Sequence, residues 1–307
     1  MSDSIKNKAK LAKDLLDAAK AKGSLGDFAY KLAARSIESH LDELSQIESA
    51  STTSPAFEML DFRIKAPHLR TGSAPLDLVA KLSKEVRKTL GYAALRLMQG
   101  GTDRRRVPKD LYSELDLRLA AILPGSSRFI ISAAANRDLF DDGISKGALE
   151  RMFAVLSSMG KGENFLSSVN VLGPSSAKSL REFLKLISSH SAEAEFTWKY
   201  SGDEVFRWKG TKEAIDAVTS ALEVTEIIEQ EKVVLHGEIE LLSKRERIEL
   251  RVDEGKLVKI LYPKNKLSQV SELHLEQEVT LLCQVTETEN PLTNESSISY
   301  ELLEIMS

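Results

Sequence analysis

The sequence predicts an α+β protein in three parts: an N-terminal helical hairpin, a central α/β domain around a mixed sheet, and a C-terminal small β-barrel of OB or SH3 type. Up to residue 224, segments with apolar residues at helical spacing alternate with segments of strand-like, period-two alternation. After residue 225 the pattern changes to short strands separated by turns. We place the three parts at 1–50, 55–224 and 230–307.

The N-terminal part consists of two amphipathic segments, 4–21 and 27–48, with Gly23 and Gly26 between them. Two helices joined by a short glycine turn are typical of an antiparallel hairpin. Two interpretations are open: the hairpin packs on the rest of the chain, or it serves as an arm for dimerisation or partner docking.

The central part begins with a strand at 57–65, in which Leu60, Phe62 and Ile64 alternate with charged residues. A loop then leads into a long helix, 76–98, with an apolar stripe and a basic outer face. Beyond it we expect a helix that starts at Pro108, a buried strand and two more helices. These four elements are placed at 108–122, 128–134, 145–158 and 175–188.

A β-hairpin at 195–209 is the clearest local pattern in the chain. Its two strands carry five aromatic residues, namely Phe196, Trp198, Tyr200, Phe206 and Trp208. Pairing of the strands would gather these rings on one face. That face is either a stacking platform for single-stranded nucleic acid, with Trp198 and Trp208 as the stacking residues, or the side of the sheet that packs against helices. A helix with Thr211 as its N-cap follows and runs to Leu222.

Five further segments predict the strands of the small barrel. They lie at 231–241, 246–252, 256–262, 276–286 and 298–304. Residues 231–307 contain 15 acidic and 9 basic side chains, so the predicted barrel is acidic.

The composition is that of an ordinary soluble globular protein, with 42% hydrophobic and 29% charged residues among 307. No apolar run approaches the roughly 18 residues that a membrane span needs, and the segment Met1 to Lys8 lacks the apolar core of a signal peptide. The single cysteine, Cys283, excludes an intramolecular disulfide. We therefore expect a cytoplasmic protein with no membrane partner.

The usual catalytic and cofactor motifs are absent from the sequence. Five scattered histidines and one cysteine offer no zinc-ligand spacing, and neither a P-loop nor a Gly-x-Ser-x-Gly motif occurs. Gly72-Ser73 lies between a predicted strand and helix, as in nucleotidyltransferases, but the pair of acidic residues that should follow is missing. We expect no cofactor and no metal site, and we favour a protein that is not an enzyme.

One acidic cluster keeps a catalytic alternative open. Asp138, Asp141 and Asp142 lie close together in the sequence, beside Asn136 and Arg137. Clustered carboxylates could hold the metal ions of a hydrolase or nuclease. Asp-Asp-Gly is equally typical of a tight turn before a helix.

The most unusual feature is a basic stretch at 63–109. It contains 12 lysines and arginines against 3 acidic residues, in a chain whose net charge is −4. Such an asymmetry indicates an anionic partner or pairing with an acidic surface. Within it, the loop at 68–75 precedes a helix N-terminus and is the best anion site. The predicted polyanion-binding residues are Arg63, Lys65, Arg70, Ser73, Arg104, Arg105, Arg106 and Lys109.

Taken together, these features predict a non-enzymatic binding or adaptor subunit of a cytoplasmic, bacterial assembly. The basic stretch would contact nucleic acid or another polyanion, and the barrel or the hairpin would contact another protein subunit. A solvated basic face, an acidic protein partner, and a purely structural homo-oligomer formed through 4–48 or the barrel are the alternatives. In general architecture alone, the chain is similar to bacterial accessory proteins encoded near genes for defence against mobile elements. This resemblance rests on no motif and assigns no role to any residue.

Overall fold

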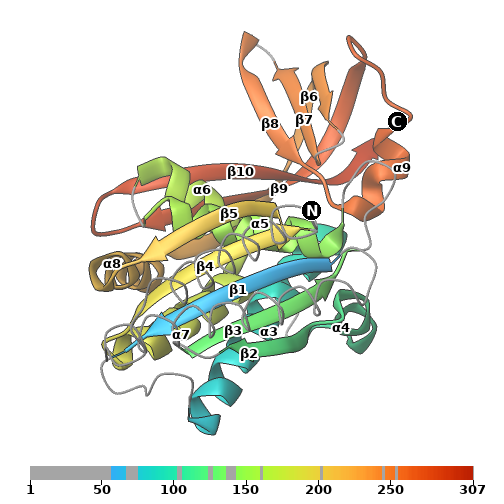
Figure 1. Ribbon diagram of the computed structural model, residues 1–307. Helices are drawn as coiled ribbons and strands as arrows, with labels where there is room; N and C mark the ends of the chain where they lie inside the picture. The colour runs from blue at the N-terminus through green and yellow to red at the C-terminus, as the bar shows by residue number, and fades with distance from the viewer. Residues whose placement is uncertain are drawn as a thin grey trace, which may run out of the picture.

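Figure 1 shows the computed structural model of the chain. It describes residues 57–66, 75–101, 106–123, 127–135, 143–159, 162–200, 203–243, 246–252 and 255–306. The helical hairpin predicted at 1–50 lies outside the described residues. No helix in the described part of the chain is long and apolar enough to cross a membrane.

The described residues form a mixed α+β structure with seven α-helices and two sheets, which confirms the predicted class. The first sheet consists of β1 (Phe57–Lys65), β2 (Arg118–Leu123), β3 (Ser127–Ala134), β4 (Glu193–Tyr200) and β5 (Asp203–Gly210). The helices that accompany it are α3 (Leu76–Gln99), α4 (Lys109–Leu115), α5 (Ile144–Ser157), α6 (Gly162–Leu172), α7 (Pro174–Ser189) and α8 (Lys212–Val224). We call β1 to α8 the central part.

The strand order of the central sheet is β2-β3-β1-β4-β5, and every neighbouring pair is antiparallel. The prediction of a mixed sheet is therefore wrong. A mixed sheet would contain neighbouring strands that run parallel and are joined by helices. Instead, the helices between β3 and β4 connect two strands that run in the same direction with β1 between them.

The core of the central part lies between the sheet and its helices. Phe62 of β1 is paired with Phe129 of β3 on one side and with Phe196 of β4 on the other. All three rings are buried, together with apolar side chains of α3, α5, α6, α7 and α8. The alternation read in residues 57–65 therefore predicted the buried face of β1 correctly.

One predicted helix is replaced by two elements. The segment expected to be helical over 108–122 forms α4 only as far as Leu115, and β2 then begins at Arg118. Asp116 takes a left-handed backbone conformation, with φ 41° and ψ 52°, which ends the helix. Helix α6 was not predicted, although Phe165, Leu166, Val169 and Leu172 recur at helical spacing.

The second sheet is a closed barrel of five strands, as the sequence predicted. Its strands are β6 (Glu226–Ser243), β7 (Arg247–Val252), β8 (Leu257–Leu261), β9 (Glu278–Asn290) and β10 (Glu295–Met306). The order around the barrel is β10-β8-β7-β6-β9; β8 and β10 are parallel and the other neighbouring pairs are antiparallel. Helix α9 (Leu267–Val270), preceded by the 3-10 turn η2 (Lys264–Lys266), lies between β8 and β9.

The barrel strands extend beyond the barrel itself and reach the central part. The first residues of β6, Glu226 to Glu229, pair with the last part of β9, from Thr286 to Glu289. The same part of β9 pairs with the beginning of β10. Figure 1 shows β9 and β10 running alongside α6, and α6 contacts both strands.

Candidate functional site

The junction between the barrel and the central part holds a half-buried cluster of charged side chains. Arg96, in the last turn of α3, places Nη2 3.6 Å from Oε2 of Glu301 on β10. The same Nη2 lies 3.4 Å from Oδ1 of Asn170 on α6, and Nδ2 of Asn170 donates to the carbonyl of Thr286 on β9 at 3.3 Å. One arginine therefore links α3, α6 and β10.

Two glycines allow this approach. Helix α3 ends at Gly100, whose φ of 81° favours glycine. The backbone N–H of Gly101 donates to Oε1 of Glu301 at 2.5 Å. A Cβ atom at either position would overlap the Glu301 carboxylate, so a larger residue would require this carboxylate to move.

A second arginine–glutamate pair lies in the same junction. Arg151 of α5 places Nη2 3.2 Å from Oε2 of Glu246, directly before β7 of the barrel, and its Nη1 donates to the carbonyl of Val171 at 3.4 Å. Burial lowers the pKa of the Arg151 guanidinium, and the carboxylate of Glu246 offsets part of this effect. Because arginine has a very high pKa, Arg151 keeps its charge and its carboxylate partner.

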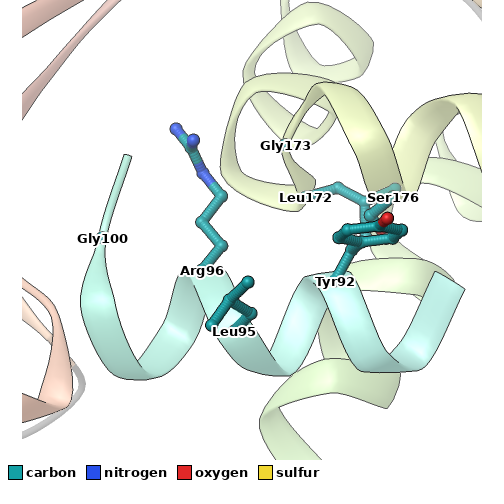
Figure 2. Close-up of a pocket in the computed structure, with 7 residues that line it drawn as sticks. All are labelled: Tyr92, Leu95, Arg96, Gly100, Leu172, Gly173 and Ser176. Carbon is teal, nitrogen blue, oxygen red and sulfur yellow. The ribbon is translucent and has the colours of Figure 1, made fainter. Parts of the chain in front are cut away.

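A small cavity lies beside Arg96 (Figure 2). Its volume is about 10 Å³, and its lining residues are Tyr92, Leu95, Arg96, Gly100, Leu172, Gly173 and Ser176. A cavity of this size holds at most about one water molecule. Gly173 has a φ of 90°, and a Cβ there would come within 2.6 Å of Cδ of Arg96. The cavity is therefore a packing feature of the junction and is far too small for a substrate.

A larger but open groove of about 550 Å³ lies on the barrel, between α9 and the end of β10. Lys266, Glu272 and Glu304 line it together with Leu273 and Ile305. The side chains that line it include no histidine, cysteine or serine.

The predicted polyanion-binding residues do not all lie together. Arg63 and Lys65 lie on β1, whereas Arg106 and Lys109 lie at the start of α4 and are exposed. Arg96, a further basic residue of the stretch, forms an ion pair with Glu301 in the junction. The predicted residues outside the described part of the chain are Arg70, Ser73, Arg104 and Arg105.

The part of the basic stretch that the structure brings together is the outer face of α3 with the start of α4. The guanidinium carbon of Arg87 lies 3.6 Å from the centroid of the Tyr112 ring on α4, within the range of a cation–π contact. Gly91 lets α4 approach α3, because a Cβ there would come within 2.5 Å of the Tyr112 ring. Burial raises the pKa of the Tyr112 hydroxyl although Arg87 acts in the opposite direction, so the ring stays neutral.

Neighbouring lysines on α3 are partly balanced by acids of the same helix. Lys81 pairs with Asp77 at 2.7 Å, and Lys88 pairs with Glu85 at 3.1 Å. Exposed pairs of this kind are weak and leave the ammonium groups accessible. We call Lys81, Lys84, Arg87, Lys88, Arg106 and Lys109 the α3–α4 basic surface.

An ionic cluster that the sequence did not reveal lies on the sheet face opposite the aromatic core. Asp61 of β1 accepts two hydrogen bonds from Arg128 of β3, at 2.8 and 2.6 Å, and one from Nζ of Lys199 of β4 at 3.1 Å. Burial by itself raises the pKa of Asp61, but Arg128 and Lys199 together lower it below its ordinary value. The three strands are therefore tied together by a carboxylate that stays ionised.

The aromatic hairpin forms as predicted, but the rings of Phe196, Trp198 and Trp208 are buried in the core, whereas Phe206 is 37% exposed. Phe196 pairs with Trp208, and Trp198 pairs with Phe206. Trp198 and Trp208 are only 2% and 6% exposed, and Nε1 of Trp198 donates to Oε2 of the buried Glu58 at 2.7 Å. The two tryptophans thus present no open ring face to a base, and their position agrees with the interpretation of a face that packs against helices.

The acidic cluster of Asp138, Asp141 and Asp142 lies outside the described residues. Within the described ranges, no group of three or more His, Cys, Asp or Glu side chains is placed to hold a metal ion. The one cysteine, Cys283, is buried in the barrel, and burial raises its pKa to about 12.

Comparisons with known proteins add no relative. No protein-family model, no curated protein and no solved structure matches the chain significantly.

Proposed function

We propose that the protein is a binding subunit that contacts nucleic acid or another polyanion through the α3–α4 basic surface. The observation that carries this proposal is the contact of Arg87 with Tyr112, which places the exposed side of α3 against α4. Lys84 and Arg87 lie one turn apart on the exposed side of α3, and Arg106 and Lys109 are exposed before and at the start of α4. A surface of this kind binds phosphates by charge and releases counterions.

We infer that the barrel has a different role from the α3–α4 basic surface. Its strand order, with the third and fifth strands parallel and a helix before the fourth, is that of an OB-fold. OB-folds bind oligonucleotides on the face formed by their second and third strands, which correspond to β7 and β8 here. Neither of these strands contains an aromatic residue for base stacking.

Both arginines of β7 also have acidic partners. Arg247 lies 3.4 Å from Glu249, and Arg251 is bonded to Glu240 on β6. Because these arginines are matched by acids and the barrel is acidic as a whole, we propose that the barrel contacts protein while the α3–α4 basic surface contacts the polyanion.

Fluorescence anisotropy with labelled single- and double-stranded DNA and RNA, over a series of salt concentrations, tests the proposal. The triple variant Lys84→Ala/Arg106→Ala/Lys109→Ala should weaken binding at least tenfold at low salt. Each lost phosphate contact should reduce the slope of log K against log salt by about 0.7 to 0.9.

The matched control removes three exposed lysines elsewhere, in the variant Lys212→Ala/Lys256→Ala/Lys259→Ala. It has the same change in net charge and should bind nearly as well as the parent chain. If the parent binds none of the four nucleic acids or polyphosphate at low salt, or if the two triple variants lose affinity equally, the proposal is wrong.

A further inference from the structure

Strand β2 forms an edge of the central sheet with an unusual composition. It pairs with β3 on one side, and in the described part of the chain no strand pairs with its other side. After Arg118 the strand reads Leu-Ala-Ala-Ile-Leu, without a charged residue or a proline. An exposed apolar edge strand is a ready template for pairing with another chain.

A β-bulge turns two apolar side chains of β2 to the same face. The register with β3 shifts between Leu119 and Ala121, so that Leu119 lies opposite Ile131 and Ile122 lies opposite Phe129. Ile131 and Phe129 both belong to the core beneath the helices. Leu119 and Ile122 therefore continue this core face to the edge of the sheet, where they are 48% and 47% exposed.

The opposite edge of the same sheet is protected by charge. Strand β5 carries Asp203, Glu204, Arg207 and Lys209 among its eight residues. Nε of Arg207 lies 3.1 Å from Glu195 on the neighbouring strand β4 and 3.6 Å from Glu204. Charged residues on an edge strand oppose the addition of a further strand, so the sheet is closed to pairing at β5 and open at β2.

We propose that β2 pairs antiparallel with β2 of a second copy of this chain, about a two-fold axis, so that the two central sheets become continuous. Such an interface presents the same strand from both sides, and the uncharged run of one copy meets the uncharged run of the other. A two-fold axis perpendicular to the sheet keeps the helix-covered faces on the same side. Leu119 and Ile122 of each copy then extend one apolar layer across the interface.

The charges next to the strand fit a copy of itself better than a charged peptide. Nε of Arg118 lies 2.8 Å from Oδ1 of Asp116, so the two charges at the beginning of β2 neutralise each other. The edge therefore offers no net charge to attract a basic or acidic segment. Because one strand pair buries less surface than a standard interface, we expect a weak dimer with a dissociation constant on the order of micromolar.

Sedimentation velocity over a concentration series tests the dimer. The parent chain should shift from monomer to dimer as its concentration rises. Ile122→Lys, which places a charge on the pairing edge, should weaken association at least tenfold. Val205→Lys is the matched control, because Val205 is 46% exposed on the charged edge strand β5, and it should associate like the parent.

Cross-linking tests the same contact in chains that keep their fold, as monitored by circular dichroism. Ile122→Cys should give a covalent product of twice the chain mass with a short bismaleimide, and Val205→Cys should not. The native Cys283 does not interfere, because it is buried and its pKa is raised to about 12.

The proposal is overturned if the parent chain stays monomeric at every concentration, or if Ile122→Lys and Val205→Lys associate equally. It is also overturned if the amide protons of β2 become protected from exchange only when an extended peptide of another protein is added. That last outcome would assign the edge to a foreign strand.

Discussion

The central part and the barrel are built around different kinds of apolar core. All ten phenylalanines and both tryptophans of the chain lie before residue 210, so none belongs to the barrel. The barrel core is aliphatic, with Tyr262 and Cys283 as its exceptions. A layer between helices and a sheet has room for large rings, whereas the interior of a five-stranded barrel is narrow and is filled by smaller side chains.

The aromatic side chains of the central core also form a continuous row of ring contacts. Phe62 stacks on Phe129 with ring centroids 4.9 Å apart, and its ring edge meets Phe196 at 6.2 Å. Phe196 in turn stacks on Trp208 at 5.2 Å. A row of rings therefore crosses β3, β1, β4 and β5, and removal of one ring leaves a gap that its neighbours cannot easily fill.

The largest expected effect comes from breaking this row. Phe62→Ala should lower the free energy of unfolding by about 4 kcal/mol, and Leu250→Ala in the barrel should lower it by about 3 kcal/mol, since its cavity is smaller. Urea unfolding should be followed by tryptophan fluorescence, which reports only on the central part, and by far-ultraviolet circular dichroism, which reports on both parts. A smaller loss for Phe62→Ala than for Leu250→Ala would contradict the difference between the cores.

We expect the contact between Arg96 and Glu301 to couple the unfolding of the central part to that of the barrel. Glu301→Gln removes the carboxylate that faces Arg96 and should destabilise the chain by about 2 to 3 kcal/mol, because a half-buried guanidinium loses its partner. The fluorescence and dichroism midpoints should then separate. Glu304→Gln on the same strand is the control, since Glu304 is exposed, and it should change neither midpoint. Coincident, unshifted transitions in Glu301→Gln would show that the junction does not couple the parts.

A smaller effect is expected from the ionic cluster on the other face of the sheet. Asp61→Asn should cost about 1 to 2 kcal/mol at neutral pH through the weakened hydrogen bonds of Arg128 and Lys199. The folded-state pKa of Asp61 is below its unfolded value of about 3.9. Its stabilisation is therefore fully present above that unfolded pKa and is lost as the pH falls through the folded pKa.

Thermal unfolding between neutral and strongly acidic pH measures this dependence. The parent chain should lose stability more steeply than Asp61→Asn in the acidic range, while Asp110→Asn, at an exposed position of α4, should follow the parent. Parallel curves for the parent and Asp61→Asn would mean that the carboxylate of Asp61 does not stabilise the sheet.

The sequence by itself determined the elements whose periodicity is strong and local. The alternation in β1, the apolar stripe of α3, the β4–β5 hairpin and the five barrel strands were all readable, and Thr211 accepts a hydrogen bond from the N–H of Ala214 as the predicted cap of α8. These features depend on neighbours within a few residues, which any chain with that pattern would share.

Only the tertiary structure decided the elements whose pattern fits two conformations. Leu-Ala-Ala-Ile-Leu at 119–123 suits a helix or a strand, and pairing with β3 made it a strand. The antiparallel order of the central sheet was equally hidden, because local periodicity does not tell which strands become neighbours.

The candidate site, too, could be predicted from the sequence only in part. A count of charges found the basic stretch, but it gave no information on which side chains share a face. Arg96 belongs to that stretch, yet it lies half-buried against Glu301, roughly 200 residues further along the chain. The pairing of two such distant charges depends on how the barrel docks on the central part, and docking is a property of the folded surfaces and leaves no periodic pattern in the sequence.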